Sequence, residues 1–241
     1  MERQANSIED LLETEQAKQK ARLQIVLKHI QNGVEFIDWK AAYIDGQVEI
    51  GAGTVVYPGV ILSGQTRIGE KCVIGHNTRI VDSVIGNEVE VQSSEILESS
   101  VGSYTKVGPF AYLRPKSRIG EHAKVGDFVE VKNSTMGNHS KASHLTYIGD
   151  SDIGDNVNLG CGVVFVNYDG KSKHRSTVKD NAFIGCNTNL VSPVTVGEKA
   201  YVAAGTTLTA DVPDGALSVA RAKQRNVEGW VEKRGLLDKK K

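Results

Sequence analysis

An aliphatic residue recurs every six positions over most of this chain, and that period constrains the fold more than any other feature. Its first members are Ile44, Ile50, Val56, Leu62, Ile68, Ile74 and Ile80. A small or β-branched residue follows four places after each, as in Val48, Thr54, Val60, Thr66, Cys72 and Thr78. Hexapeptide periodicity is typical of a parallel β-helix, in which three six-residue units close a coil of about 18 residues. We therefore predict an all-β fold, a left-handed parallel β-helix over residues 44–213, with aliphatic ladders filling its interior.

Departures from the period indicate where the coil changes shape. Steps of five separate Ile80 from Ile85, Val91 from Ile96, Ile96 from Val101, Val131 from Met136, and Ile148 from Ile153. The step from Phe165 to Val178 is 13 residues, so the chain must expel a loop at 167–176. Asn, Asp and Gly favour turns there, in the run N-Y-D-G. Because loops on a rigid scaffold often carry ligand contacts, we expect one beside this loop.

Residues 1–43 read as a helix and a lead-in to the repeat. The helix is predicted over residues 7–32, with Ser7 as its cap, Asp10 reaching back to it, and Gly33 as its stop. Its apolar face is expected to consist of Leu23, Val26, Leu27 and Ile30. The many charged residues and the single apolar stripe favour a packing or linking role for this helix.

The repeat ends after Val212 at the tripeptide P-D-G. Residues 214–241 form a C-terminal arm that is too polar to fold alone, so we expect it to pack against a neighbour. Its last three residues, Lys239 to Lys241, are most simply a solvated tail.

Composition excludes several classes of function. Lys plus Arg and Asp plus Glu both number 29, so the net charge is zero and a nucleic-acid partner is not expected. No run of 18 apolar residues exists, and we expect no membrane association. The three cysteines, Cys72, Cys161 and Cys186, lack a C-x-x-C pair and indicate a reducing, cytoplasmic environment.

Six short motifs inside the repeat and its arm are more specific than the repeat itself. They are L-R-P, K-V-G-D-F-V-E-V-K-N, S-H-L-T-Y-I-G-D, V-N-Y-D-G, A-A-G-T-T and A-R-A-K-Q-R-N-V-E-G-W. Together they resemble the C-terminal domain of the bacterial bifunctional N-acetylglucosamine-1-phosphate uridyltransferase/glucosamine-1-phosphate acetyltransferase, over roughly residues 10–232.

The resemblance implies acetyl transfer from acetyl-CoA to the amine of glucosamine-1-phosphate, a step toward UDP-N-acetylglucosamine and cell-wall precursors. The family's nucleotidyltransferase domain carries a Gly-rich loop of the G-x-G-T-R-M kind, and the sequence has no such run. The uridyltransferase activity and its magnesium are therefore not expected on this chain.

His144, in S-H-L-T-Y, matches the family's catalytic base. The assignment is chemically sensible, because an ammonium must lose a proton before it attacks a thioester and imidazole accepts protons near neutral pH. Asp150, six residues further on, is a candidate to orient the imidazole. A hydrogen-bonded turn histidine is the alternative role for His144.

The resemblance also assigns the sugar-phosphate ligands to Arg114, Lys132, Tyr147 and Asn158. Arg114 and Lys132 lie 18 residues apart, which is one coil, so we expect them to stand side by side and to meet the phosphate.

The acetyl-CoA positions implied by the family are Cys161, Asn167, Tyr168, Cys186, Ala204 and Arg221. Arg221 would pair with the coenzyme's phosphates. A thiol at position 186 also suggests a covalent acyl intermediate, but nothing in the sequence supplies it with a base.

Two other functions are considered beside acetyl transfer. Gamma-class carbonic anhydrases use a similar prism and an H-x-x-x-x-H zinc motif, which His139 and His144 imitate. The third ligand position holds Ser103, and His122 lies about one coil away, so no metal is expected. A non-catalytic scaffold or regulatory partner is the second alternative. The family forms homotrimers with sites between subunits, which the resemblance implies here as well. Preference for glucosamine- or galactosamine-1-phosphate stays open.

Overall fold

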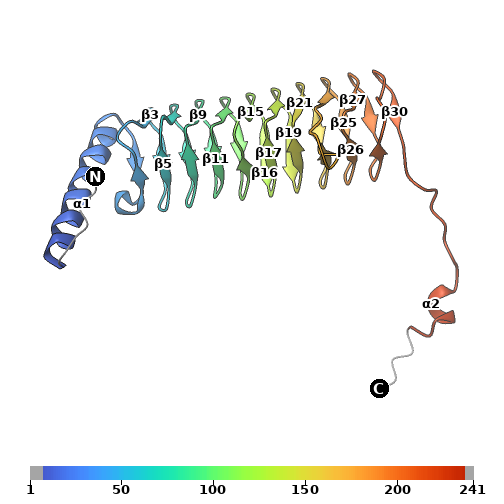
Figure 1. The fold of residues 1–241 in the computed structure, drawn as a ribbon, viewed down its shortest axis with the longest axis horizontal. Helices are drawn as coiled ribbons and strands as arrows, with labels where there is room; N and C mark the ends of the chain where they lie inside the picture. Colours follow the sequence, from blue (N-terminus) through green and yellow to red (C-terminus); the bar gives the residue numbers. More distant parts are fainter. Residues whose placement is uncertain (1–7, 237–241) are drawn as a thin grey trace.

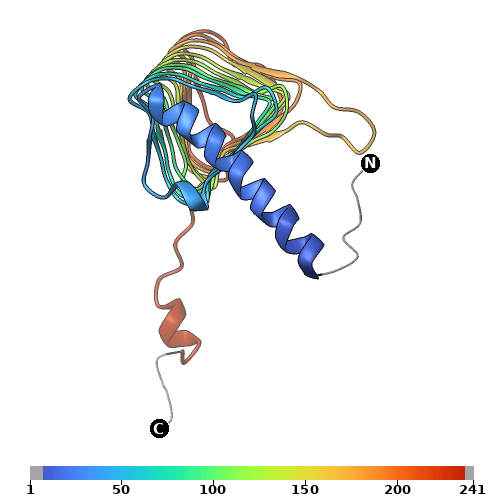
Figure 2. The same ribbon diagram turned by 90° about the vertical axis from the view of Figure 1, so that its left-hand side faces the viewer.

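A computed structural model describes residues 8–236 of the chain, and its body is a solenoid of short parallel strands stacked along one axis (Figure 1). Each strand pairs in parallel with the strand three places further along the chain for most of the solenoid, so three sheets form its three walls. The end view shows the nearly superposed coils as a triangular outline (Figure 2). The predicted parallel β-helix is confirmed.

The three walls are called sheets A, B and C. Sheet A contains β1 (Glu35–Phe36), β4 (Val55–Val56), β7 (Val73–Ile74), β10 (Glu90–Val91), β13 (Lys106–Val107), β16 (Lys124–Asp127), β19 (Lys141–His144), β22 (Asn158–Leu159), β25 (Phe183–Ile184), β28 (Tyr201–Val202) and β30 (Leu217–Ser218). Sheet B contains β2 (Tyr43–Ile44), β5 (Ile61–Ser63), β8 (Arg79–Val81), β11 (Glu95–Leu97), β14 (Tyr112–Leu113), β17 (Glu130–Lys132), β20 (Tyr147–Gly149), β23 (Val164–Val166), β26 (Asn189–Val191) and β29 (Thr207–Leu208). Sheet C contains β3 (Glu49–Ile50), β6 (Arg67–Ile68), β9 (Val84–Ile85), β12 (Ser100–Val101), β15 (Arg118–Ile119), β18 (Thr135–Met136), β21 (Ser151–Ile153), β24 (Ser176–Val178) and β27 (Thr195–Val196).

The aliphatic residues of the repeat fill the interior in ladders that run along the axis. Every predicted ladder residue from Ile44 to Leu208 is buried, including those on both sides of the five-residue steps. A five-residue step shortens one corner of a coil without changing which side chain points inward, as between Ile80 and Ile85. The period and its exceptions therefore both follow from packing one aliphatic side chain per wall of each coil.

The sheets extend beyond the expected range of 44–213 at both ends. Strand β1 pairs with β4, so the lead-in contributes a strand, and β30 pairs with β28 before the arm departs. Between β1 and β2 the chain forms one short 3-10 helix, η1 (Trp39–Ala41).

Helix α1 (Ile8–Gln31) crosses the first end of the solenoid (Figure 2), and Gly33 follows it with a φ of 83°. The predicted Ser7 cap lies outside the described residues. The predicted apolar face is wrong in part, because Leu27 and Ile30 are exposed while Val26 and His29 are buried.

Arg22 explains which face of α1 meets the solenoid. Its guanidinium donates to the backbone oxygens of Lys40 and Ala42 at 2.7 and 2.9 Å and lies 4.1 Å from the ring centroid of Tyr43. With this contact, the side of α1 that faces the solenoid consists of residues 22, 25, 26 and 29, which share one helical face. A polar contact with the coil thus selects the face, which hydrophobicity alone does not predict.

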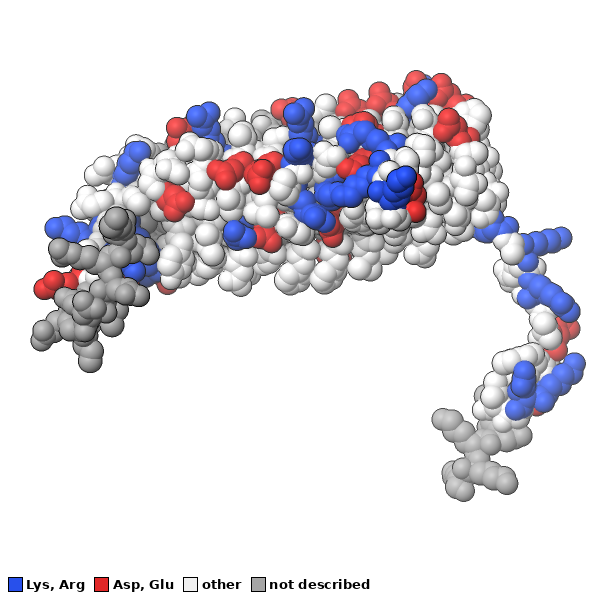
Figure 3. Space-filling view, viewed as in Figure 1, with Lys and Arg blue, Asp and Glu red and all other residues white. Residues whose placement is uncertain are grey.

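After β30 the chain leaves the solenoid as an extended arm that carries the short helix α2 (Trp230–Lys233) (Figure 1). Lys and Arg side chains line the arm (Figure 3). Among residues 8–236, no helix is both long and apolar enough to cross a membrane.

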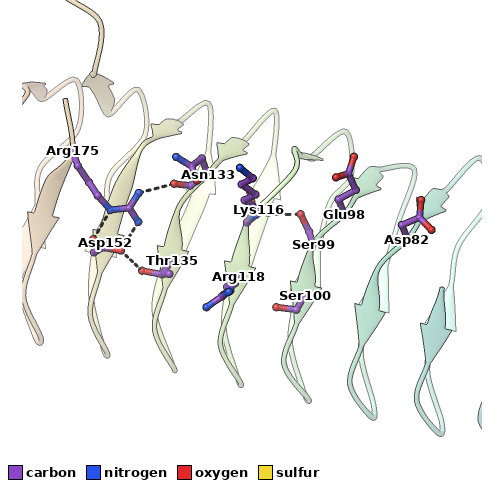
Figure 4. A pocket seen from close by; sticks show the side chains of 11 residues that line it. Asp82, Glu98, Ser99, Ser100, Lys116, Arg118, Asn133, Thr135, Asp152 and Arg175 are labelled. Atoms are coloured by element: carbon purple, nitrogen blue, oxygen red, sulfur yellow. Dashed lines mark hydrogen bonds and ion pairs between the residues drawn. The ribbon is translucent and has the colours of Figure 1, made fainter. Parts of the chain in front are cut away.

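The expelled loop, residues 167–176, projects from the triangular body (Figure 2). Arg175 ties its second end to sheet C and donates to both carboxylate oxygens of Asp152 (Figure 4). The same guanidinium donates to the backbone oxygens of Asn133 at 2.9 Å and Ser151 at 3.2 Å. The hydrogen bonds from Arg175 hold the pKa of the Asp152 carboxyl below its usual value. This contact fixes where the loop returns to the sheet.

Replacing Arg175 with Ala should release the loop while leaving the coils intact. Amide hydrogen exchange of residues 167–174 is expected to rise, because the loop loses its charge-assisted anchor. The matched control is Arg118→Ala, since Arg118 is exposed in the same groove and contributes no side-chain bond to the loop (Figure 4). Unchanged exchange in the Arg175 variant would show that the ion pair does not hold the loop.

Candidate functional site

Register between coils places five residues in one row at the end of the sheet-A strands. Asp127 pairs directly with His144 across β16 and β19. Three pairs of core residues continue this alignment along the axis: Ala142–Leu159, Leu159–Ile184 and Ile184–Val202. Each further member of the row lies two residues after one of these core residues. The row, called the edge row below, consists of Asp127, His144, Cys161, Cys186 and Ala204. It brings the predicted base and three predicted coenzyme positions together.

His144 is held by Asp127, and the predicted orienting role of Asp150 is wrong. The His144 Nδ1 atom lies 2.5 Å from Oδ1 of Asp127, and both side chains remain partly open to solvent. The hydrogen bond with His144 lowers the pKa of the Asp127 carboxyl, which is therefore a carboxylate at neutral pH. An anionic acceptor places the imidazole proton on Nδ1 and leaves Nε2 free to accept one.

A group of cations lies on sheet B, across the corner that joins sheets A and B. Arg114 and Lys132 follow the paired residues Leu113 and Val131, so they stand side by side on neighbouring coils, as predicted. Arg114 forms an ion pair with Glu130 at 2.8 Å, and Lys132 forms one with Asp150 at 3.5 Å.

Lys173, on the expelled loop, is a third cation that sequence reasoning missed. Contact with Lys132 and its positive charge lower the pKa of Lys173, and the charge of Arg114 acts in the same direction. The contact with Lys173 and the charge of Asp150 raise the pKa of Lys132. Glu130 and Asp150 offset two of these three positive charges, and the remaining charge favours an anion at this place.

Asp150 organises this cation group instead of the base. Its carboxylate accepts hydrogen bonds from the side-chain amides of Asn133, at 2.6 Å, and Asn167. Burial opposes the charge, but these bonds and Lys132 outweigh it and lower the pKa of Asp150. Asn167 is buried at the base of the loop and so acts as a structural anchor in this chain.

Gly149 leaves room for the predicted ligand Tyr147. A Cβ at position 149 would lie 2.5 Å from the Tyr147 hydroxyl and 2.7 Å from the Asn167 amide nitrogen. Because Gly149 pairs with Lys132 across the strands, the Tyr147 hydroxyl lies on the cation side of the corner. A hydroxyl here is well placed to contact a sugar.

Three other predicted site residues lie apart from the sheet-B cations. Tyr168 is exposed, and its hydroxyl donates to the Gly170 carbonyl of its own loop at 2.6 Å. Asn158 lies on the outer face of sheet A beside Lys141, away from the sheet-B cations. Arg221 begins the arm, and its guanidinium donates to the Ala204 carbonyl at 2.5 Å, next to the edge row.

His139 lies in a row of stacked rings, whereas His144 is bonded to Asp127. Its ring lies on that of His122, with centroids 4.8 Å apart, and His122 lies on Tyr104 at 4.7 Å. In the part of the chain that the structure describes, no group of three or more His, Cys, Asp or Glu side chains is placed to hold a metal ion. The two histidines of the H-x-x-x-x-H motif thus have different surroundings.

Comparison with known proteins agrees with the motifs. A family model described as the hexapeptide repeat of succinyl-transferase matches residues 177–210. The bifunctional protein GlmU of Alkaliphilus metalliredigens is 55% identical over 231 residues, which are 96% of this chain and 50% of that protein. GlmU of Alkaliphilus oremlandii is 60% identical over 234 residues, 97% of this chain and 51% of that protein.

Among solved structures, a UDP-N-acetylglucosamine acyltransferase of Francisella novicida aligns with 81% of this chain and 72% of its own, at 18% identity and a TM-score of 0.48. That likeness is distant, whereas the GlmU matches are extensive. The chain spans about half the length of the curated relatives it matches. Over nearly its whole length, this chain is therefore homologous to one half of the bifunctional GlmU proteins, the family that its motifs resemble.

Proposed function

We propose that this chain transfers acetyl from acetyl-CoA to the amine of glucosamine-1-phosphate. One observation carries the proposal: the edge row joins a carboxylate-held imidazole to the predicted coenzyme positions, while three cations gather around the adjacent corner. Homology to half of GlmU supports the same reaction. The product would feed synthesis of UDP-N-acetylglucosamine in the cytoplasm.

In this mechanism Arg114, Lys132 and Lys173 hold the phosphate, and Tyr147 contacts a sugar hydroxyl. The amine nitrogen attacks the thioester carbonyl carbon, the carbon–sulfur bond breaks, and the coenzyme leaves as its thiolate. His144 accepts the amine proton on Nε2, while Asp127 stabilises the imidazolium that forms. Placement of the two substrates accounts for much of the remaining rate enhancement.

The coenzyme would follow the edge row from His144 toward Ala204. Its acyl end would lie beside His144, and Arg221, which donates to the Ala204 carbonyl at the far end of the row, would pair with its phosphates. Backbone groups at Cys161, Cys186 and Ala204 supply contacts that do not depend on the side chain.

The working form would be a homotrimer with sites between subunits. Phe110, Phe128 and Leu145 form an exposed apolar ladder at the corner beside Asp127 and His144, with the two Phe rings 5.4 Å apart. Exposed apolar patches of this kind are typical of protein interfaces. Asn158, on the outer face of sheet A, and the extended arm would then complete the site of a neighbouring subunit.

Replacing His144 with Ala should lower kcat by roughly 10²- to 10⁴-fold, because the amine loses its proton acceptor. Release of free thiol from acetyl-CoA in the presence of glucosamine-1-phosphate measures the rate. The matched control is His139→Ala, which removes a stacked imidazole five residues away. Equal rates in the two variants would refute the base role, and no thiol release from the unaltered chain would refute the acetyltransferase proposal. Galactosamine-1-phosphate in the same assay tests the sugar preference.

Replacing Lys173 with Ala should raise KM for glucosamine-1-phosphate by about 10- to 100-fold, the effect of losing one charge-assisted hydrogen bond. KM for acetyl-CoA should not change, because Lys173 lies with the phosphate cations. Lys171→Ala, in the same exposed loop, serves as the control. A matching rise in both variants would mean that the loop, and not the ammonium of Lys173, affects binding.

Replacing Asp127 with Asn tests the charge beside the base. Because the hydrogen bond with His144 lowers the pKa of Asp127, its carboxylate is charged throughout the neutral range. Asn removes the negative charge that stabilises the imidazolium formed during attack. kcat at neutral pH should therefore fall by up to about tenfold, since solvent screens an exposed pair. An unchanged kcat would contradict the assignment.

A further inference from the structure

Two thiols occupy consecutive places in the edge row. Cys161 follows β22 and Cys186 follows β25, each two residues beyond the paired core residues Leu159 and Ile184. Backbone hydrogen bonds on both sides fix this alignment: Gly160 donates to Ile184 and Asn187 donates to Cys161, each at 2.8 Å. Neighbouring strands lie about 4.8 Å apart, so the two Cα atoms are held near that separation.

That separation suits a covalent bond between the thiols. Disulfides span Cα atoms about 4.4–6.8 Å apart. Both cysteines lie where a strand ends in a turn, since Gly162 and Asn187 next to them have φ values of 76° and 54°. Their side chains are therefore outside the packed interior, with Cys161 partly exposed and Cys186 exposed.

Cys72 provides an internal contrast. It is fully buried, and its Sγ donates to the Gly86 carbonyl at 3.1 Å. Burial raises the pKa of this thiol, which disfavours the reactive thiolate. One of the three cysteines is thus shielded from solvent, and the two thiols that solvent reaches are the pair in the edge row.

We infer that Cys161 and Cys186 form a dithiol modification site that hydroperoxides close into a disulfide across two adjacent coils. The Cys186 sulfur attacks the peroxide oxygen, the oxygen–oxygen bond breaks, and a sulfenic acid and water result. The Cys161 sulfur then attacks the sulfenic sulfur, a sulfur–sulfur bond forms, and a second water leaves. Two thiols and one hydrogen peroxide give one disulfide and two waters, with sulfur oxidised and peroxide oxygen reduced.

The consequence for activity rests on the proposed function. Cys161 is one coil from His144, so a disulfide in this row would occupy the track that the acetyl donor follows. Acetyl-CoA bound along the row should slow the oxidation, and the disulfide should weaken acetyl-CoA binding. Reduction by dithiothreitol should restore the two free thiols and the binding of acetyl-CoA.

The experiment treats the full chain with hydrogen peroxide and measures intact mass, followed by peptide mapping without reduction. We expect the loss of two hydrogen atoms and a cross-linked peptide pair that contains Cys161 and Cys186. The cross-link should form at the same rate in Cys72→Ala and should be absent from Cys161→Ala and from Cys186→Ser. Added CoA should delay it, and acetyl-transfer activity should fall as it accumulates and return with dithiothreitol.

Stable sulfenic or sulfinic acid on single cysteines, without the cross-link, would overturn the inference. A disulfide between two chains, seen as a dimer band on a non-reducing gel, would overturn it as well. Because the mass measurement needs no activity, a chain that fails to transfer acetyl still tests the dithiol. A cross-linked chain with full activity would refute only the link to the donor track.

Discussion

Backbone hydrogen bonds between successive coils determine everything else in this structure. They hold each strand in register with the strand above it, so residues far apart in sequence become neighbours along the axis. Inside, this register stacks aliphatic side chains into continuous ladders. Outside, it arranges polar side chains in rows, and the edge row is one of them. A shift of one residue in any pair would move the ladder outward and destroy the row.

The same rigidity explains which site residues lie on strands and which lie on the loop at the corner between sheets A and B. The proposed base, His144, and the carboxylate of Asp127 lie on strands, where the register fixes their separation. The cations that we propose to bind phosphate come partly from strands and partly from the expelled loop, which Asp150, Asn167 and Arg175 hold to the coils. A loop anchored at both ends can bring Lys173 to the strand cations without disturbing the ladders. The groups that must be oriented thus lie on the coils, and the loop adds one further charge to the cations already there.

Much of the fold was predictable because one physical requirement, an aliphatic side chain per wall of each coil, leaves a direct trace in the sequence. The predicted ladder from Ile44 to Leu208 is buried throughout. The neighbourhood of Arg114 and Lys132 was predictable for the same reason, since one coil separates them.

The partners of the site residues were harder to predict. Asp127 lies 17 residues before His144, and only the five-residue step within that coil brings the two into register. Asp150 was the simpler choice by period, yet it faces the adjacent wall and binds Lys132. Lys173 depends on the path of an irregular loop, for which no period exists. The contact face of α1 differs from the face that its apolar residues predict, because Arg22, a polar residue, binds the first coil.

We propose that the register of the coils places the base between a phosphate-binding group and the row that the acetyl donor follows. A crystal structure of the chain with glucosamine-1-phosphate and CoA would test this arrangement. We expect the phosphate against Arg114, Lys132 and Lys173, the sugar amine within hydrogen-bond distance of His144 Nε2, and the coenzyme sulfur beside the same histidine. A phosphate bound elsewhere, or an amine out of reach of His144, would show that the register does not build this site.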